Sequence, residues 1–125
     1  MTVTAKDLLA AANAAVPKVT PEEARDLIAR GALVVDVRDG TEVLASGKVA
    51  GAVHAQRGLL EFKADSGMPT HDPEFRKDRT VIVYCASGGR SALAGKTLKD
   101  MGFSDVRNLG GFKGWVDAGG EVEKA

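Results

Sequence analysis

The sequence contains a single cysteine, Cys85, and only two histidines, His54 and His71. One cysteine cannot form an internal disulfide, and so few Cys and His residues do not make the clustered ligand set of a structural zinc site. A lone cysteine is more often a small buried apolar residue than a nucleophile. A catalytic role for Cys85 therefore has to be supported by the residues around it.

An excess of one charge and long apolar runs are also missing. The 17 Lys and Arg residues balance the 17 Asp and Glu residues, so the net charge favours neither nucleic acid nor an anionic membrane as a partner, and we expect neither. No segment approaches the roughly 18 apolar residues that a membrane span requires. The apolar stretch at 8–12 is flanked by Asp7 and Asn13 and has no basic segment before it, unlike a signal peptide. We therefore expect a cytoplasmic protein.

A chain of 125 residues fits one domain with one hydrophobic core. Thr4, with Asp7 three residues later, predicts the cap of a short amphipathic helix. We expect residues 1–18 to form this N-terminal helix and a linker, and residues 19–125 to form the domain.

The rest of the chain alternates between helix and strand patterns. Thr20-Pro21-Glu22-Glu23 forms a capping box with Pro at the first helical position, and Gly31 ends that helix. The runs at 32–37 and 80–84, rich in β-branched residues, are typical of strands buried on both faces. Further short strands are expected at 49–54 and 104–109, and helices at 59–64, 90–101 and 112–118. This order predicts an α/β fold whose parallel sheet is covered by helices on both faces.

Three polar segments follow predicted strands, and parallel strands place such segments at one edge of the sheet. They are Asp36-Val37-Arg38, His54-Ala55-Gln56-Arg57 and Cys85-Ala86-Ser87-Gly88-Gly89-Arg90. In the third segment two glycines allow the backbone to curl until successive N–H groups point inward, which makes an anion-binding nest. The helix that follows adds unsatisfied N–H groups and the positive end of its dipole. A Cys85 thiol in this position should have a lowered pKa and be partly ionised at neutral pH.

Arg90 also bears on this loop. A cation at a helix N-terminus opposes the helix dipole, so we expect Arg90 either to face an anion or to hold the loop through a carboxylate. A solvated surface arginine is the plain alternative. Ser87 and Ser91 can donate hydrogen bonds to the anion or cap the helix. Cys85 and Arg90 are thus the candidate catalytic residues.

The chain resembles a rhodanese-homology domain over residues 19–121. The matching motifs are Asp36-Val37-Arg38 with Glu42 behind it, Gly47-Lys48-Val49-Ala50-Gly51-Ala52-Val53-His54, the Cys85 loop followed by Ser91, and Gly110-Gly111-Phe112-Lys113-Gly114-Trp115. Their order and spacing together are highly specific. The resemblance implies a five-stranded parallel sheet flanked by helices. It also implies transfer of sulfane sulfur through a cysteine persulfide, with no metal or organic cofactor.

Two residues depart from the family pattern, since Lys48 and Ala50 stand where the motif usually has His and Pro. Those positions are structural in the family, so we expect little effect on the chemistry. The segment from His54 to Asp72 is similar to the polysulfide-sulfurtransferase branch. His54 itself is more typical of a strand-end histidine with its hydrogen bonds satisfied than of a catalyst.

In the expected reaction, the Cys85 thiolate takes the outer sulfur from an anionic donor, which is thiosulfate, a polysulfide or another persulfide. The acceptor is cyanide, a thiol or a protein cysteine. The loop from Ala86 through Ser87, Gly88 and Gly89 is expected to bind the anions through its amides, together with Ser91.

Arg38 and Arg57 are further candidates for binding the donor, because each follows a predicted strand and could steer an anion into the site. Arg38 could instead form an ion pair with Glu42, four residues further on. Asp36 ends a buried strand, and we expect it to orient an arginine or the loop. Glu42 is expected to support the site in the same way.

Other functions compete with this one. Phosphatases and arsenate reductases use Cys-x5-Arg loops that wrap a tetrahedral oxyanion, whereas four residues separate Cys85 from Arg90 here, and no nearby Asp stands out as a general acid. The segment Gly95-Lys96-Thr97 resembles the end of a phosphate loop, but Arg90 stands where that motif needs glycine. A non-enzymatic regulatory module, or a carrier that hands persulfide sulfur to a protein partner, stays open because a fold does not define a function.

Overall fold

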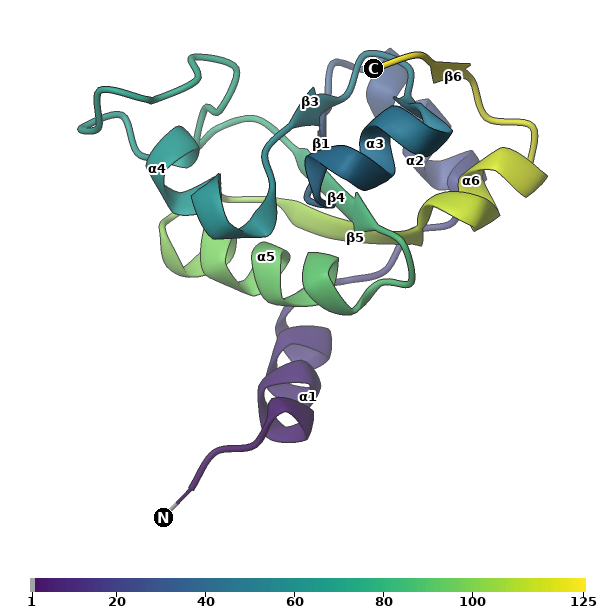
Figure 1. The fold of residues 1–125 in the computed structure, drawn as a ribbon. Coiled ribbons are helices and arrows are strands. Elements are labelled where there is room, and N and C mark those ends of the chain that lie inside the picture. Colours follow the sequence, from purple (N-terminus) through teal and green to yellow (C-terminus); the bar gives the residue numbers. More distant parts are fainter. Residues whose placement is uncertain (1) are drawn as a thin grey trace.

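The computed structural model describes residues 2–125, and Met1 of the predicted N-terminal segment lies outside the described residues. At its centre is a parallel sheet of four strands in the order β3-β1-β4-β5, with helices on both sides (Figure 1). The strands are β1 (Leu33–Asp36), β3 (Val53–His54), β4 (Val81–Cys85) and β5 (Val106–Gly111). The predicted α/β fold with a parallel sheet between helices is therefore confirmed.

The other elements connect these strands along the chain. The helices are α1 (Ala5–Ala15), α2 (Pro21–Ala29), α3 (Gly40–Ser46), the 3₁₀ turn η1 (Arg57–Leu59), α4 (Leu60–Ala64), α5 (Gly89–Asp100) and α6 (Phe112–Asp117). Two short strands, β2 (Lys48–Val49) and β6 (Val122–Glu123), form a separate antiparallel pair. None of the helices within residues 2–125 is long and apolar enough to cross a membrane.

Alternate residues of the central strands point to opposite faces of the sheet, so each face has its own core. Val35 and Val83 belong to the core that α4 and α5 cover, and Cys85 lies in this core as well. Val34 and Ile82 belong to the core that α2 and α6 cover. The strand β4 is buried along its whole length, as its composition predicts. Its carboxyl end therefore places Cys85 inside the protein, beneath the start of α5.

The fifth strand that the family resemblance implies does not form. Beyond β5 the chain makes only an isolated parallel bridge between Lys18 and Asn108. The Asn108 N–H donates to the Pro17 carbonyl at 2.8 Å, and the Val19 N–H donates to the Asn108 carbonyl at 3.0 Å. Because Pro17 has no N–H, it cannot extend the pairing backward along β5 toward Val106.

The helix α1 docks on α5. Val16, just after α1, is buried in the core, and a β-carbon on Gly95 would approach its methyl groups to 3.0 Å. The Lys99 ammonium donates to the carbonyl of Ala15 at 2.7 Å. Most of α1 is exposed, and Figure 1 shows its N-terminal end extending away from the sheet.

Candidate active site

The loop that joins β4 to α5 carries the only cysteine. Gly88 adopts φ of 102°, a left-handed conformation that favours glycine, and this turn brings the chain back toward the end of β4. Gly111, at the end of β5, packs so closely below the loop that a β-carbon there would lie 2.7 Å from the Ala86 carbonyl oxygen. Both glycines are therefore required by the shape of the loop.

The Cys85 sulfur is held by the loop that follows it. The Gly88 N–H donates to Sγ at 3.0 Å, and the Ser91 hydroxyl lies 3.4 Å from Sγ. Burial of Cys85 raises the pKa of its thiol, but hydrogen bonds from the Ser91 side chain and from the N–H groups of Ser91, Gly88 and Ser87 outweigh it, so the net pKa is lowered. The geometry favours a thiolate, as the sequence predicts.

A buried polar residue of β5, Asn108, contacts both Ser91 and the loop backbone. The Ser91 hydroxyl oxygen is 2.8 Å from Asn108 Oδ1 and 3.1 Å from the Gly88 carbonyl oxygen. The Asn108 amide also donates to that carbonyl at 3.3 Å and accepts from the Gly110 N–H at 2.9 Å. Asn108 and Ser91 are both buried. The sequence interpretation does not include Asn108, although a polar residue next to Leu109 in a predicted strand is the signal that could have pointed to it.

Arg90 binds Glu42 of α3. Its two terminal nitrogens contact the two carboxylate oxygens at 2.6 and 3.0 Å. This carboxylate raises the pKa of Arg90, and the charge of Cys85 adds to the effect. The alternative in which Arg90 holds the loop through a carboxylate is the one that the structure shows. Glu42 thus pairs with Arg90 and not with Arg38.

Arg38 lies inside the protein, 3% exposed, and each nitrogen of its guanidinium has a hydrogen-bond partner. It binds both carboxylate oxygens of Asp36 at 2.7–3.1 Å, the Ser46 hydroxyl at 2.8 Å and the Gly47 carbonyl at 2.8 Å. The Tyr84 hydroxyl donates to the same Asp36 carboxylate at 2.6 Å. Asp36 therefore orients an arginine, and we leave Arg38 out of the donor-binding site because its side chain is buried and each of its nitrogens already has a partner.

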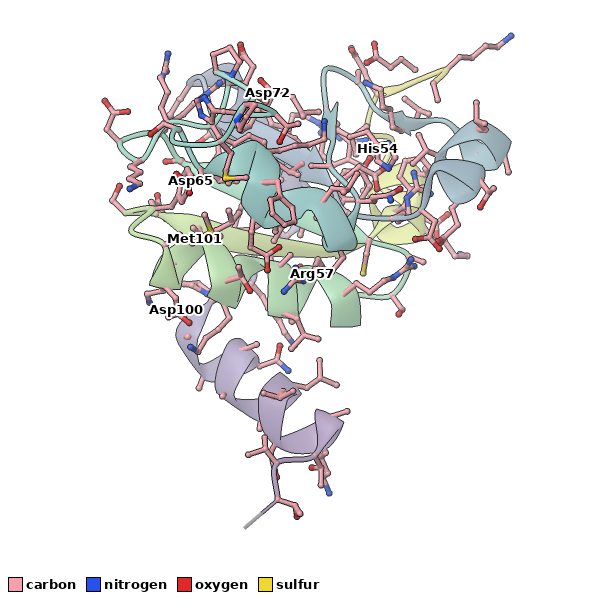
Figure 2. All side chains as sticks on the ribbon, turned by 60° about the vertical axis from the view of Figure 1, so that its left-hand side comes forward. His54, Arg57, Asp65, Asp72, Asp100 and Met101 are labelled. Atoms are coloured by element: carbon pink, nitrogen blue, oxygen red, sulfur yellow. The ribbon has the colours of Figure 1, made fainter. Side chains whose placement is uncertain are left out.

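Arg57 lies on the flank of α5. It donates to Glu61 at 2.9 Å and to the Thr97 hydroxyl at 3.0 Å, and Figure 2 shows it beside that helix, away from His54. The His54 ring nitrogen Nε2 is 2.7 Å from the Arg38 carbonyl oxygen, so this histidine has a structural partner. Arg57 keeps a partly exposed side chain, whereas Arg38 does not.

One pocket borders the loop between Cys85 and Arg90. It has a volume of about 370 Å³ and lies between α1, the loop and the end of β5. Leu9 and Lys18 line it on one side, and Ser87, Gly88 and Gly89 on the other. Within residues 2–125, no group of three or more His, Cys, Asp or Glu side chains is arranged to hold a metal ion.

Comparison with known proteins shows the family of this chain. The sequence model of the rhodanese-like domain matches residues 20–118. Thiosulfate sulfurtransferase GlpE of Pseudomonas fluorescens is 36% identical over 100 residues, which cover 78% of this chain and 83% of that protein. GlpE of Pseudomonas entomophila is 35% identical over the same length.

Solved structures show the same fold. The polysulfide-sulfur transferase homodimer of Wolinella succinogenes superposes with a TM-score of 0.75 at 32% identity, covering 96% of this chain and 87% of that chain. A Rhodopseudomonas palustris protein of unknown function, described as a possible tyrosine phosphatase, superposes with a TM-score of 0.88 at 40% identity, covering 98% of this chain and 96% of that chain. By the match to the family model and by these relatives, the chain belongs to the rhodanese-like domain family.

Proposed function

We propose that this protein is a sulfurtransferase that carries sulfane sulfur as a persulfide on Cys85. The observation that carries the proposal is the environment of the Cys85 sulfur: it accepts a hydrogen bond from the Gly88 N–H at 3.0 Å, and the pKa of the Cys85 thiol is lowered. The relatives named thiosulfate sulfurtransferase support the same activity. No other residue type in the loop is a nucleophile of comparable strength at neutral pH.

In the loading step the Cys85 thiolate attacks the outer sulfur of thiosulfate. A bond forms between Sγ and that sulfur, the S–S bond of thiosulfate breaks, and sulfite leaves with the electron pair. The negative charge of the thiolate moves to the outer sulfur of the new persulfide. The loop amides stabilise this anion in the same way that they stabilise the thiolate.

In the unloading step a thiophilic acceptor attacks the outer sulfur. Cyanide leaves as thiocyanate, and a thiolate leaves as a persulfide. In both cases the bond between Sγ and the outer sulfur breaks, and Cys85 takes back the electron pair as a thiolate. No proton has to be moved when the donor and the acceptor are both anions, so the site needs no general base.

Arg90 and Arg57 have different places in this proposal. Arg90 keeps the loop closed through Glu42, and its charge favours the anionic forms of Cys85. Arg57 follows β3 at the carboxyl edge of the sheet and has a partly exposed guanidinium. It is the cation that we assign to the attraction of anionic donors.

The decisive experiment is intact mass spectrometry after incubation with thiosulfate or polysulfide. The wild type should gain about 32 Da, the mass of one sulfur atom, and Cys85→Ser should gain nothing. Cyanide should then remove the added mass and release thiocyanate. A persulfide that forms but passes to no small acceptor would indicate a carrier for a protein partner. The absence of an adduct with every donor would refute the proposal.

A phosphatase activity is the second candidate, because the Rhodopseudomonas palustris structure is described as a possible tyrosine phosphatase. The present loop is one residue shorter than a Cys-x5-Arg loop, and both terminal nitrogens of Arg90 are bound to Glu42. Hydrolysis of p-nitrophenyl phosphate that is lost in Cys85→Ser would favour this candidate over sulfur transfer.

A further inference from the structure

Three hydrogen-bond acceptors compete for the single hydroxyl proton of Ser91. The oxygen Oγ lies 2.8 Å from Asn108 Oδ1, 3.1 Å from the Gly88 carbonyl oxygen and 3.4 Å from Cys85 Sγ. A hydroxyl group donates one proton at a time, so these acceptors cannot all be served at once. Which acceptor receives the Ser91 hydroxyl proton must depend on which of them carries negative charge.

The charge on Sγ changes during the proposed reaction. In the free enzyme Sγ is a thiolate and a strong acceptor, whereas in the persulfide Sγ is a neutral bridging sulfur and the charge lies on the outer sulfur. Ser91 is buried, so its hydroxyl cannot turn to bulk water when Sγ stops accepting. A buried donor without a partner is unfavourable, so the hydroxyl must turn to another acceptor.

We propose that Asn108 is the second position of a hydroxyl switch: the Ser91 hydroxyl donates to Cys85 Sγ in the thiolate and returns to Asn108 Oδ1 when Sγ is protonated or carries sulfur. Asn108 is hydrogen-bonded to Ser91 and to the loop backbone and acts on Sγ through Ser91, so it is a positioning residue. The role in sulfur loading rests on the proposed function, whereas the role in thiol ionisation does not.

Two further hydrogen bonds hold the Asn108 side chain in place. Its Oδ1 also accepts from the Gly110 N–H at 2.9 Å, and its amide nitrogen donates to the Gly88 carbonyl at 3.3 Å. These two bonds fix the orientation of the amide and keep Oδ1 directed at Ser91. The Gly110 N–H also keeps Oδ1 partnered when the hydroxyl turns away, so the switch leaves no unpaired acceptor behind.

The charged groups around the thiol stay constant in the test. Arg90 at the start of α5 interacts electrostatically with Cys85 and is paired with Glu42 of α3. At the end of the neighbouring strand β1, Asp36 and Arg38 form a closed pair. None of these groups is changed in the variants below, and neither Asn108→Leu nor Ser91→Ala adds a charge, so a shift in ionisation in those variants reports on the hydroxyl and its partners.

The test compares Asn108→Leu with Asn108→Asp. The leucine removes one of the two competing acceptors and leaves only the Gly88 carbonyl, so the Ser91 hydroxyl donates to Sγ more of the time and the rate of iodoacetamide alkylation below the pKa of Cys85 should rise by about threefold. The aspartate keeps the acceptor and adds charge, so the rate should fall by a similar factor. If Asn108 only braces the loop, Asn108→Leu would lower the alkylation rate or leave it unchanged, and that outcome would overturn the switch.

The Ser91→Ala background gives the control. Without the hydroxyl, Asn108→Leu should leave the alkylation rate unchanged, and an equal effect in both backgrounds would refute action through Ser91. Thermal melts of each variant establish that it is folded. In the wild type, the side-chain amide NMR resonance of Asn108 should shift as Cys85 ionises, which tests the switch without any substitution. A resonance that stays in place while Cys85 ionises would contradict the switch.

The role of Asn108 in sulfur loading is tested with mixtures of thiosulfate and sulfite at a set ratio. Intact mass spectrometry then measures the fraction of protein that carries the persulfide. Asn108→Leu should lower the ratio of persulfide to thiol by about threefold, because the hydroxyl then has no partner other than the Gly88 carbonyl in the loaded state. An unchanged ratio would contradict the loading role. If no persulfide forms in any variant, the proposed function fails, while the alkylation rates still decide the switch.

Discussion

Arg90 and Glu42 form a two-point contact between elements that lie 48 residues apart in the chain, with nitrogen–oxygen distances of 2.6 and 3.0 Å. The pair joins the first turn of α5 to the first turn of α3. Cys85 begins the loop and Arg90 ends it, so the contact holds the far end of the loop while β4 holds the near end. The loop amides keep their positions because both ends are attached.

Replacing Arg90 with lysine should test this contact. The ammonium keeps the charge but cannot make the planar two-point contact, so the loop should loosen and kcat/KM for sulfur transfer should fall by about tenfold. Glu42→Gln keeps the shape of the partner and removes its charge, and it should have a smaller effect. Full activity in Arg90→Lys, measured as thiocyanate formation, would show that the pair does not shape the loop.

The interior pair of Asp36 and Arg38 should matter for stability. Arg38→Met leaves the Asp36 carboxylate buried without its cation, so the free energy of unfolding should drop by about 3–5 kcal/mol. The double variant Asp36→Asn/Arg38→Met should recover part of this loss, because no buried charge is left unpaired. Urea unfolding at neutral pH measures both values, and a loss below about 1 kcal/mol in the single variant would contradict the prediction.

The lowered pKa of Cys85 predicts a pH dependence. Alkylation should fall as the solution is acidified through the pKa of the folded protein, which lies below that of an ordinary thiol. Ser91→Ala removes the largest interaction that lowers this pKa, so the midpoint should move to higher pH. Ser87→Ala is the matched control, because Ser87 contributes only its backbone N–H. A midpoint that Ser91→Ala leaves in place would show that the hydroxyl does not stabilise the thiolate.

The same pKa difference has a consequence for stability. Because the pKa is lower in the folded state, ionised Cys85 stabilises the fold at pH values above the pKa of the unfolded thiol. This contribution disappears as the pH falls through the folded pKa. Cys85→Ser should therefore flatten that part of the stability profile, as measured by urea unfolding at several pH values.

The close approach of β5 to the loop gives a steric prediction. In Gly111→Ala the new methyl group would meet the Ala86 carbonyl at 2.7 Å, so the loop must move and sulfur loading should slow by about tenfold or more. Gly114→Ala is the control, since a β-carbon there meets nothing within 4 Å. Stopped-flow mixing with polysulfide measures the loading rate, and equal rates in both variants would refute the steric argument.

Arg57 should act on donor binding more than on chemistry. Arg57→Ala should raise KM for thiosulfate by about two- to fivefold at low salt, with little change in kcat, and added salt should reduce the difference. Arg30→Ala removes an exposed positive charge on α2 and serves as the control. Unchanged kinetics at every ionic strength would remove Arg57 from the donor path.

Local signals explain most of what could be predicted about the fold. The capping box of Thr20 and Glu23 starts α2 as expected, and the buried runs become β1 and β4. The helix α3 has the same kind of signal in Asp39 and Glu42, but the sequence interpretation does not use it. The pair β2–β6 joins Lys48 to Glu123, and no local pattern predicts so distant a contact.

The sequence by itself determined the placement of Cys85 at a strand end, before a glycine-containing loop and a helix. Those features depend on neighbouring residues, which is why they can be read along the chain. Only the tertiary structure decided which partner each polar group takes: Glu42 for Arg90, Asp36 for Arg38, and Asn108 for Ser91. Each choice depends on distances between strand ends and helix ends from separate parts of the chain, and the packing of the sheet sets those distances.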